Sequence, residues 1–199
     1  MTEPDQKQEE QKDTQTASTG ADNLLERRYW VEFQRPTIGT RELMDDIKLN
    51  IEEYAPGLLA DFEKTVGEPR TLQVGDQFGI RILGPWNGDV RVTDVDDTSF
   101  TFETLEGHPE AGTICFSLTP HEHFADAWHF EIRSLAASRD GLVAFTYDTL
   151  GVGKKMQEKT WVTFCQRVLE KSGGEALGDI QVRTLEKEEM PAEVKAEAE

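Results

Sequence analysis

The stretch that decides the fold is GVGKKMQEKTWVTFCQRVLEKS, residues 151–172. Its apolar residues recur at three- and four-residue steps, which is the spacing of one face of an α-helix. Gly173 and Gly174 follow directly and favour a helix end, because glycine tolerates positive φ. Burying its large side chains stabilises by roughly 1.5–3 kcal/mol each before entropy is subtracted, so we expect this helix to dock on a sheet. The predicted apolar face comprises Val152, Met156, Trp161, Cys165, Val168, Leu169 and Ser172.

The two ends of the 199-residue chain differ in composition from its middle. The first residues are a mixture of Gln, Glu, Lys and Thr, and the last are mostly Glu, Lys and Ala. Such segments bury too little apolar surface to offset the entropy of ordering, so residues 1–23 and 178–199 are predicted to be disordered tails. Residues 24–177 are predicted to form one domain, since single cores commonly close at about 100–200 residues.

The formal net charge of −18 argues against phosphate backbones and anionic membrane surfaces, so we expect no nucleic-acid partner. No run reaches the ~18 apolar residues of a membrane span, and the first residues lack the apolar core of a signal peptide. The two cysteines, Cys115 and Cys165, lack CxxC spacing and indicate buried thiols in a reducing compartment. We therefore expect a cytoplasmic protein without a cofactor, and the sequence leaves its oligomeric state open.

The order of elements along the chain predicts an antiparallel sheet. Residues 28–35 alternate as a half-buried strand does, and residues 40–54 and 58–66 have helical spacing on either side of Pro56. From residue 71 onward the period changes to two, with turn residues at hairpin-like intervals. The residues predicted to share the inner face of this meander are Phe78, Ile80, Ile82, Val90, Val92, Phe100, Phe102, Ile114, Phe116, Leu118, Trp128, Phe130, Ile132, Val143, Phe145 and Tyr147.

This succession of a strand, two short helices, several strands and one long helix resembles the helix-grip fold of START-like and birch-pollen-allergen-like proteins. The resemblance implies an α+β architecture in which a curved antiparallel sheet of about seven strands wraps a long C-terminal helix. It also implies a hydrophobic cavity between the sheet and that helix.

Two motifs resemble a plant and bacterial family known as a domain of unknown function. They are LEGHPEAG at residues 105–112 and LGVGKKMQEKTWVTFCQRV at residues 150–168. The family has a Gly-His-Pro-Glu-x-Gly turn and a Gly-rich start to a helix that carries Gln-Glu, Thr-Trp and Phe-Cys. Residues 130–140 depart from it, because they lack the Ser-x-Pro expected after the strand. The resemblance supports the fold and transfers no catalytic residue.

The turn around His108 is the most enzyme-like cluster in the sequence. An imidazole at His108 and a carboxylate at Glu110, held by Pro109, could act as an acid/base pair, with Tyr147 as a further candidate. The alternative is a plain hairpin turn in which His108 bonds a backbone carbonyl. The sequence favours the turn.

A second group of imidazoles follows at His121, Glu122 and His123, with His129 further on. These residue types bind divalent metals, but Pro120 and Ala125 indicate a solvated loop, so we predict no metal site. Glu131 and Arg133 alternate with core residues and point away from the core, or line a cavity if the facing is reversed.

An apolar pocket is predicted beneath the C-terminal helix, with Tyr147, Gln157 and Trp161 at a polar end. Packing without a ligand is the alternative. The stretch GVGKK lacks the GxxxxGK[ST] spacing of a phosphate loop, so we exclude that function. The residues predicted to bind the ligand are Phe116, Trp128, Phe130, Phe145, Tyr147, Gln157 and Trp161.

Three functions follow from these patterns. The first is the binding of a small hydrophobic or amphipathic ligand between sheet and helix. The second is a cyclase-like or hydratase-like enzyme that uses His108, Glu110 or Tyr147. The third is an interaction protein with a filled core and acidic surface. The space beneath Trp161 distinguishes them, because only the first two require a cavity there.

Overall fold

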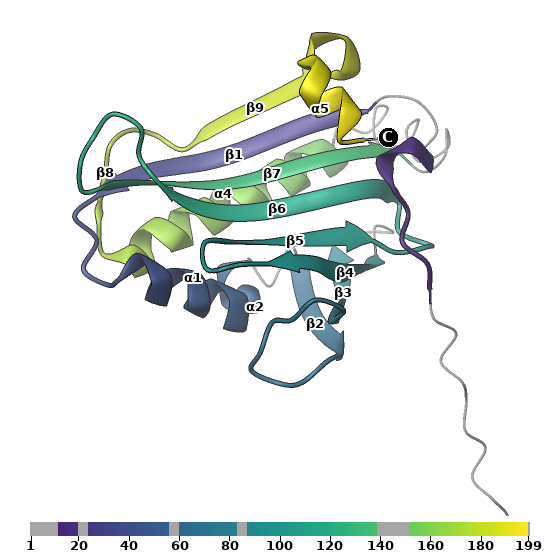
Figure 1. The fold of residues 1–199 in the computed structure, drawn as a ribbon, viewed down its shortest axis with the longest axis horizontal. Coiled ribbons are helices and arrows are strands. Elements are labelled where there is room, and N and C mark those ends of the chain that lie inside the picture. The colour runs from purple at the N-terminus through teal and green to yellow at the C-terminus, as the bar shows by residue number, and fades with distance from the viewer. Residues whose placement is uncertain (1–11, 20–23, 56–59, 83–86, 139–151, 199) are drawn as a thin grey trace, which may run out of the picture.

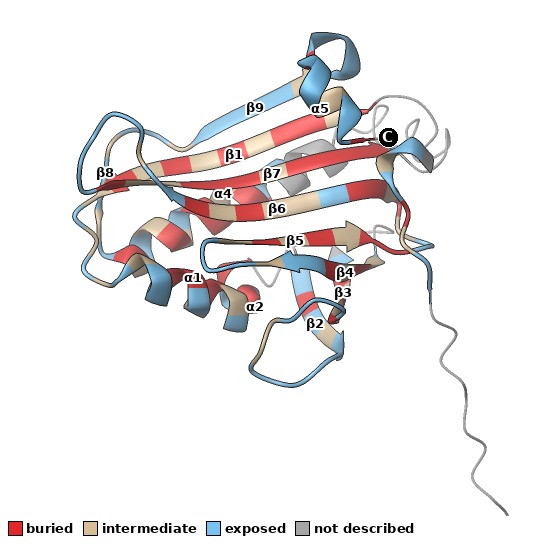
Figure 2. Cartoon of the chain, in the orientation of Figure 1, coloured by how far each residue is buried: buried red, intermediate tan, exposed pale blue. Residues whose placement is uncertain are grey.

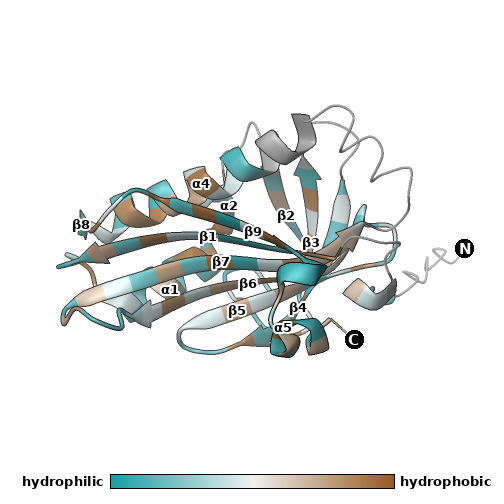
Figure 3. Ribbon diagram, turned by 90° about the horizontal axis from the view of Figure 1, so that it is seen from above, coloured by the Kyte–Doolittle hydropathy of each residue, from teal (hydrophilic) through white to brown (hydrophobic). Residues whose placement is uncertain are grey.

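A computed structural model describes residues 12–19, 24–55, 60–82, 87–138 and 152–198 (Figure 1). Within these residues the chain forms one antiparallel sheet with a long helix, α4, lying along one side of it, as the turned view in Figure 3 shows. The elements are η1 (Ala17–Thr19), β1 (Leu25–Gln34), α1 (Thr40–Leu49), α2 (Ile51–Tyr54), β2 (Ala60–Val66), β3 (Gln77–Ile82), β4 (Gly88–Val95), β5 (Ser99–Thr104), β6 (Glu110–Pro120), β7 (Ala127–Ser138), α4 (Val152–Ser172), β8 (Glu175–Ala176), β9 (Gln181–Glu186), η2 (Lys187–Glu189) and α5 (Ala192–Ala196).

The sheet confirms the predicted α+β helix-grip fold. Its strands lie in the order β2-β3-β4-β5-β6-β7-β1-β8, and β9 also pairs with β1. Within the described residues the sheet has nine strands, which are six of the predicted strands together with β2, β8 and β9, which were not expected. Strand β1 extends the sheet beyond the meander by pairing antiparallel with β7.

The core lies between the sheet and α4, and its centre is Phe164. This side chain is fully buried, and its ring lies 5.3 Å from Tyr54, 5.3 Å from Phe116 and 5.9 Å from Phe130, measured between ring centroids. Strands alternate as predicted, so that one face of each is buried and the other is polar or partly exposed (Figure 2). The inner side chains of β1, for example, are Tyr29, Val31 and Phe33.

Helix α4 spans Val152–Ser172, which confirms the predicted helix. It ends at Gly173, whose φ of +64° is the left-handed conformation expected just beyond a helix. Phe164 was missing from the predicted apolar face, although it completes the i, i+3, i+4, i+7 series from Trp161 through Cys165 to Val168. No described helix combines the length and apolar character needed to cross a membrane.

The predicted helix over residues 58–66 is wrong in its described part, because Ala60–Val66 forms β2. The two short helices after the first strand are α1 and α2, which together occupy the predicted first helix and are separated at Asn50. Phe62 lies opposite Ile80 in the ladder and is buried, whereas Val66 is 40% exposed. Pairing with β3 therefore overrides the helical spacing of the apolar residues.

The predicted disordered C-terminal tail is also wrong over the described residues. Strand β9 pairs with β1 from Leu25 to Trp30, and η2 and α5 follow it. Met190 and Ala198 are buried in a second, smaller apolar cluster on the outer face of the sheet, against Leu24, Leu135 and Ala137. A few apolar residues in a charged segment suffice here, because Leu24, just before β1, and two residues of β7 present a matching apolar patch.

The N-terminal tail is only partly described. Residues 12–19, which we call the strap, lie against the sheet: Thr14 forms an isolated bridge with Leu105, and Gln15 is buried. The predicted disorder is therefore wrong for the strap. Residues 1–11 and 20–23 lie outside the described residues, as does the strand predicted at residues 142–149.

Replacing Phe164 with Ala should lower the free energy of unfolding by about 3–5 kcal/mol, because it empties the most enclosed position of the core. Urea unfolding monitored by circular dichroism measures the change. Lys159→Ala, at an exposed position of the same helix, is the control and should change the free energy by less than about 0.5 kcal/mol. Equal losses in both variants would contradict the assignment of Phe164 to the centre of the core.

Candidate functional site

A cavity of about 70 Å³ lies between the sheet and the N-terminal half of α4. Its walls are mainly apolar side chains from β2 to β7 and from the helix. The residues that define it are Phe62, Ile80, Phe102, Ile114, Phe116 and Trp161. A cavity therefore lies beneath Trp161, as a ligand-binding protein requires and an interaction protein with a filled core does not.

Trp161, which lines this cavity, carries a buried hydrogen-bond donor without a partner among the described residues. Its side chain is only 8% exposed, and its ring contacts Phe116 and Phe62 edge-on at centroid distances of 5.8 and 6.4 Å. Among the described residues, its Nε1 is the buried side-chain nitrogen or oxygen that has no hydrogen-bond partner. Leaving such a donor unpaired costs about 1–3 kcal/mol, so the position calls for an acceptor.

The Gly-His-Pro-Glu turn forms the rim of the cavity, through His108, Pro109 and Glu110. The Nδ1 atom of His108 contacts both the N–H and the carbonyl oxygen of Glu110, at 3.0 and 2.8 Å. This is the backbone contact that the turn interpretation predicts. The imidazole ring also lies against Gly88, where a Cβ atom would come within 2.1 Å of His108 Cδ2, so only glycine fits there.

The carboxylate of Glu110 forms an ion pair with Arg27 and is therefore not available as a general base. Arg27 Nη1 donates to Glu110 Oε1 at 2.9 Å, and the two side chains are only 9% and 15% exposed. A carboxylate bound by a guanidinium is a weak proton acceptor. The proposed pairing of His108 with Glu110 for acid/base chemistry thus gains no support from this geometry and stays a prediction.

The strap holds this rim in place. Gln15 Nε2 donates to the carbonyl oxygens of His108 and Glu110, at 3.0 and 3.2 Å. The backbone N–H of Gln15 donates to Thr104 O at 2.9 Å, and the Thr104 hydroxyl donates back to Gln15 O at 3.1 Å. The same hydroxyl accepts from the N–H of Gly112 at 3.0 Å. The buried side chain of Gln15 therefore holds the rim of the cavity in place.

Of the residues predicted to bind a ligand, Phe116 and Trp161 line the cavity. Phe130 lies deeper, in the core against Phe164, and Trp128 is half-buried near the other end of β7. Phe145 and Tyr147 lie outside the described residues, and so does the side chain of Gln157, which belongs to α4. The sequence analysis did not identify Arg27 and Phe62 as residues at the cavity. Arg27 was not expected on the inner face because it is charged, and Phe62 was assigned to a helix.

Neither cysteine is a candidate nucleophile. Burial raises the pKa of the Cys165 thiol and that of the Cys115 thiol above their ordinary values. Burial likewise raises the pKa of Tyr29, next to Arg27 on β1, to about 12. These groups are uncharged at neutral pH; Tyr29 and Cys165 belong to the core, whereas Cys115 is half-buried.

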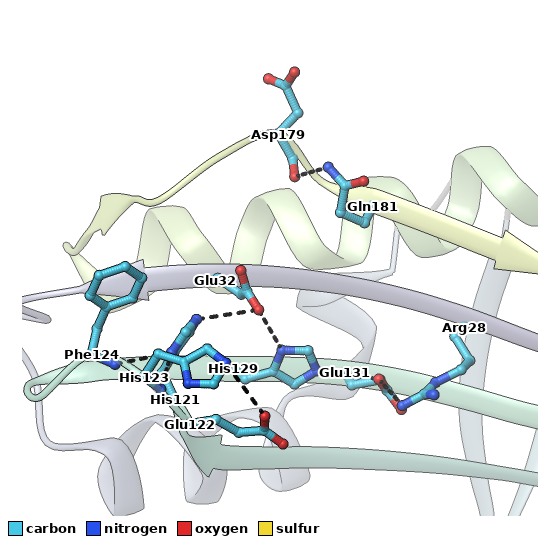
Figure 4. A network of polar contacts seen from close by, with 10 residues as sticks. All are labelled: Arg28, Glu32, His121, Glu122, His123, Phe124, His129, Glu131, Asp179 and Gln181. Atoms are coloured by element: carbon cyan, nitrogen blue, oxygen red, sulfur yellow. Dashed lines mark hydrogen bonds and ion pairs between the residues drawn. The ribbon is translucent and has the colours of Figure 1, made fainter.

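The outer face of the sheet carries a separate polar network (Figure 4). Arg28 donates to both carboxylate oxygens of Glu131, at 3.1 and 2.8 Å. His129 lies between two carboxylates, with Nε2 at 3.2 Å from Glu131 and Nδ1 at 3.2 Å from Glu32. His121 reaches the same Glu32 oxygen at 3.5 Å. Glu131 thus points away from the core, which confirms the first of the two predicted facings.

The histidine-rich loop also turns as predicted rather than forming a strand. His121 Nδ1 accepts hydrogen bonds from the N–H groups of His123 and Phe124, at 3.0 and 3.3 Å. The lone pair of His121 Nδ1 therefore accepts hydrogen bonds within the loop. Across the part of the chain that the structure describes, no three His, Cys, Asp or Glu side chains are grouped as a metal site.

The sheet that wraps α4, and the cavity between them, define a protein of the helix-grip class. The chain belongs to the family described as "Domain of unknown function (DUF1990)", which matches residues 15–171 and so begins at the strap residue Gln15. No curated protein matches the chain.

Solved structures with a similar fold come from plants and bacteria. A norcoclaurine synthase from Thalictrum flavum, in complex with dopamine and hydroxybenzaldehyde, is 11% identical with a TM-score of 0.48, over 74% of this chain and 88% of that chain. A conserved protein from Geobacillus kaustophilus is 15% identical with a TM-score of 0.47, over 75% of this chain and 99% of that chain. At such values neither indicates a ligand or an activity for this chain.

Replacing Gln15 with Ala should lower the free energy of unfolding by about 1–3 kcal/mol, because two carbonyl oxygens at the rim lose their buried donor. Urea unfolding measures the loss. Asp13→Ala is the control, since Asp13 is exposed and its backbone oxygen, which accepts from Glu106, is retained. A Gln15→Ala protein as stable as the Asp13→Ala protein would show that the strap does not hold the rim.

The stability of the outer network should depend on pH. The hydrogen bond to Glu131, and then that to Glu32, raises the pKa of His129 although burial opposes this. Because the pKa of His129 is higher in the folded state than in the unfolded state, the protonated imidazole stabilises the fold. This stabilisation is complete below the unfolded pKa of about 6.5, and it is lost as the pH rises through the pKa of the folded state. The difference in unfolding free energy between the parent and His129→Gln should therefore shrink as pH rises from about 5.5 to 8.5. A difference independent of pH would contradict this.

Proposed function

We propose that the chain binds a small uncharged ligand in the cavity between the sheet and α4. The apolar part of the ligand contacts Phe62, Phe102 and Phe116, and a carbonyl or ether oxygen accepts the N–H of Trp161. The observation that carries the proposal is that Trp161, which lines an apolar cavity, has a buried indole nitrogen without a hydrogen-bond partner among the described residues. A ligand acceptor there removes the cost of the unpaired donor.

The residues around the cavity indicate the charge of the ligand, and the cavity volume indicates its size. Among the described residues, the guanidinium of Arg27 lies next to the rim, and it is already compensated by Glu110. A charged ligand would lose its hydration without gaining a counter-ion, which is costly in an apolar cavity. One water needs roughly 10–15 Å³, so 70 Å³ admits a ligand group of a few heavy atoms, such as a single ring. A larger ligand would extend out past His108.

The alternatives are less well supported. A filled-core interaction protein does not need a cavity beneath Trp161. A cyclase-like or hydratase-like enzyme needs a base at the rim, and the carboxylate of Glu110 is held by Arg27. A cytoplasmic location remains our proposal, because Cys115 and Cys165 are free thiols, as a reducing compartment maintains them.

Acetophenone and ethylbenzene form a test pair, since they have similar shapes and only the first carries a carbonyl oxygen. Acetophenone should bind about 2- to 12-fold more tightly, which corresponds to one net hydrogen bond of about 0.5–1.5 kcal/mol. Trp161→Phe keeps an aromatic ring but removes the donor, so it should abolish the difference. Binding is measured by titration in ¹H–¹⁵N NMR spectra, where the indole N–H of Trp161 should shift.

Filling the cavity is the second arm of this test. Ala136 lines the cavity and Ala137, the next residue of β7, faces the other way into the outer apolar cluster. Ala136→Leu should abolish binding of both compounds, and Ala137→Leu should retain it even if stability falls. Unchanged binding in Ala136→Leu, or an equal preference for acetophenone in Trp161→Phe, would overturn the proposal.

A further inference from the structure

Three arginines lie side by side across adjacent strands on the outer face of the sheet. Arg28 of β1 is directly opposite Arg133 of β7 on one side and Arg183 of β9 on the other. Residues paired in this way point to the same face, and like charges directly opposite one another are destabilising. In a chain with a net charge of −18, this row is a local concentration of positive charge.

Two of the three arginines are neutralised within the protein. Arg28 pairs with Glu131, and Arg133 donates to Glu26 at 2.6 Å and to Glu197 at 2.8 Å. The third, Arg183, is exposed, and within the described ranges it forms no ion pair. The row therefore ends in a guanidinium whose donors face solvent next to Arg28.

Arg183 borders a groove of about 700 Å³ on the outer face, within the usual size range of ligand sites. We call it the outer groove; it is lined by Arg28, Trp30, Glu32, His121, Phe124, His129, Glu131 and Arg183, among others. Its floor is the polar network of Figure 4, in which His129 and its carboxylate partners hold one another in place. The groove is separate from the cavity under α4, because it lies on the opposite face of the sheet.

Several acceptors of the outer groove are already used within the protein. The Glu131 carboxylate is occupied by Arg28 and His129, and Oε1 of Glu32 is contacted by His129 and His121. Glu122, at the rim, lies 3.9 Å from His123. The guanidinium of Arg183 remains available, together with the hydroxyl groups of Ser117 and Thr119 in the wall. Such a set is complementary to an anion.

We propose that the outer groove binds a small organic anion whose phosphate or carboxylate group lies on Arg183 beside Arg28 and whose planar apolar part lies against Trp30. Trp30 is half-buried at the floor, next to the ring of His129 at 6.3 Å, and Phe124 is 57% exposed at the rim. These rings give a planar ligand an apolar surface.

The acidity of the whole chain does not exclude this ligand. Repulsion from distant carboxylates is screened beyond the Debye length of about 8 Å at physiological salt, whereas the arginines would contact the anion directly. The same acidity still disfavours polyanions such as nucleic acids, which would have to lie across many carboxylates. The inference is therefore restricted to small anions.

Phenyl phosphate, titrated into the full-length protein and followed in ¹H–¹⁵N NMR spectra, tests the proposal. Saturable binding is expected, with shifts of the Trp30 indole N–H. Arg183→Gln should weaken it at least about tenfold, because a charge-assisted contact is lost. Arg81→Gln is the matched control, since Arg81 is an exposed arginine of β3 paired with Glu63, and it should leave the affinity within about twofold.

Trp30→Leu adds a second criterion, because it should weaken phenyl phosphate while leaving the affinity for inorganic phosphate unchanged. The proposal is overturned if no saturable binding occurs up to about 10 mM. It is also overturned if Arg183→Gln and Arg81→Gln bind phenyl phosphate equally well.

Discussion

The packing of α4 against the inner face of the sheet is the interaction on which the rest of the structure depends. Phe164 anchors it between Tyr54, Phe116 and Phe130. The C-terminal half of the helix is also tied to the short helices, because Lys171 bonds Asp46 and Glu53 at 3.1 and 2.6 Å. These contacts lie toward the C-terminal end of the helix, and the cavity lies further toward its N-terminus, beneath Trp161.

Strand β1 shows how one sequence can serve two sites. Because successive side chains point to opposite faces, Arg27 reaches the rim of the cavity while Arg28 belongs to the outer network. Each arginine forms an ion pair with a carboxylate of another strand: Arg27 with Glu110 of β6, and Arg28 with Glu131 of β7. Strand β1 therefore couples the position of the Gly-His-Pro-Glu turn to the ladder with β7, and a change of register by one residue would exchange the two sites.

Features that depend on local periodicity could be predicted from the sequence. The bounds of α4, the alternation of the meander and the turn at His108 are of this kind, and so are Phe116 and Trp161 as cavity residues. Features that depend on long-range partners could not. Residues 60–66 have helical spacing but pair with β3, and the charged tail is ordered by Met190 on a distant apolar patch. The partner of Arg27 is likewise 83 residues away.

Between the sheet and α4 lies an unfilled apolar cavity. Diffraction from crystals under xenon pressure can detect it, because xenon enters empty apolar cavities large enough to hold it. We expect a xenon peak in contact with Phe62, Phe102, Phe116 and Trp161 in the otherwise unchanged protein. Side chains of the protein filling this space, with no xenon bound there, would contradict it.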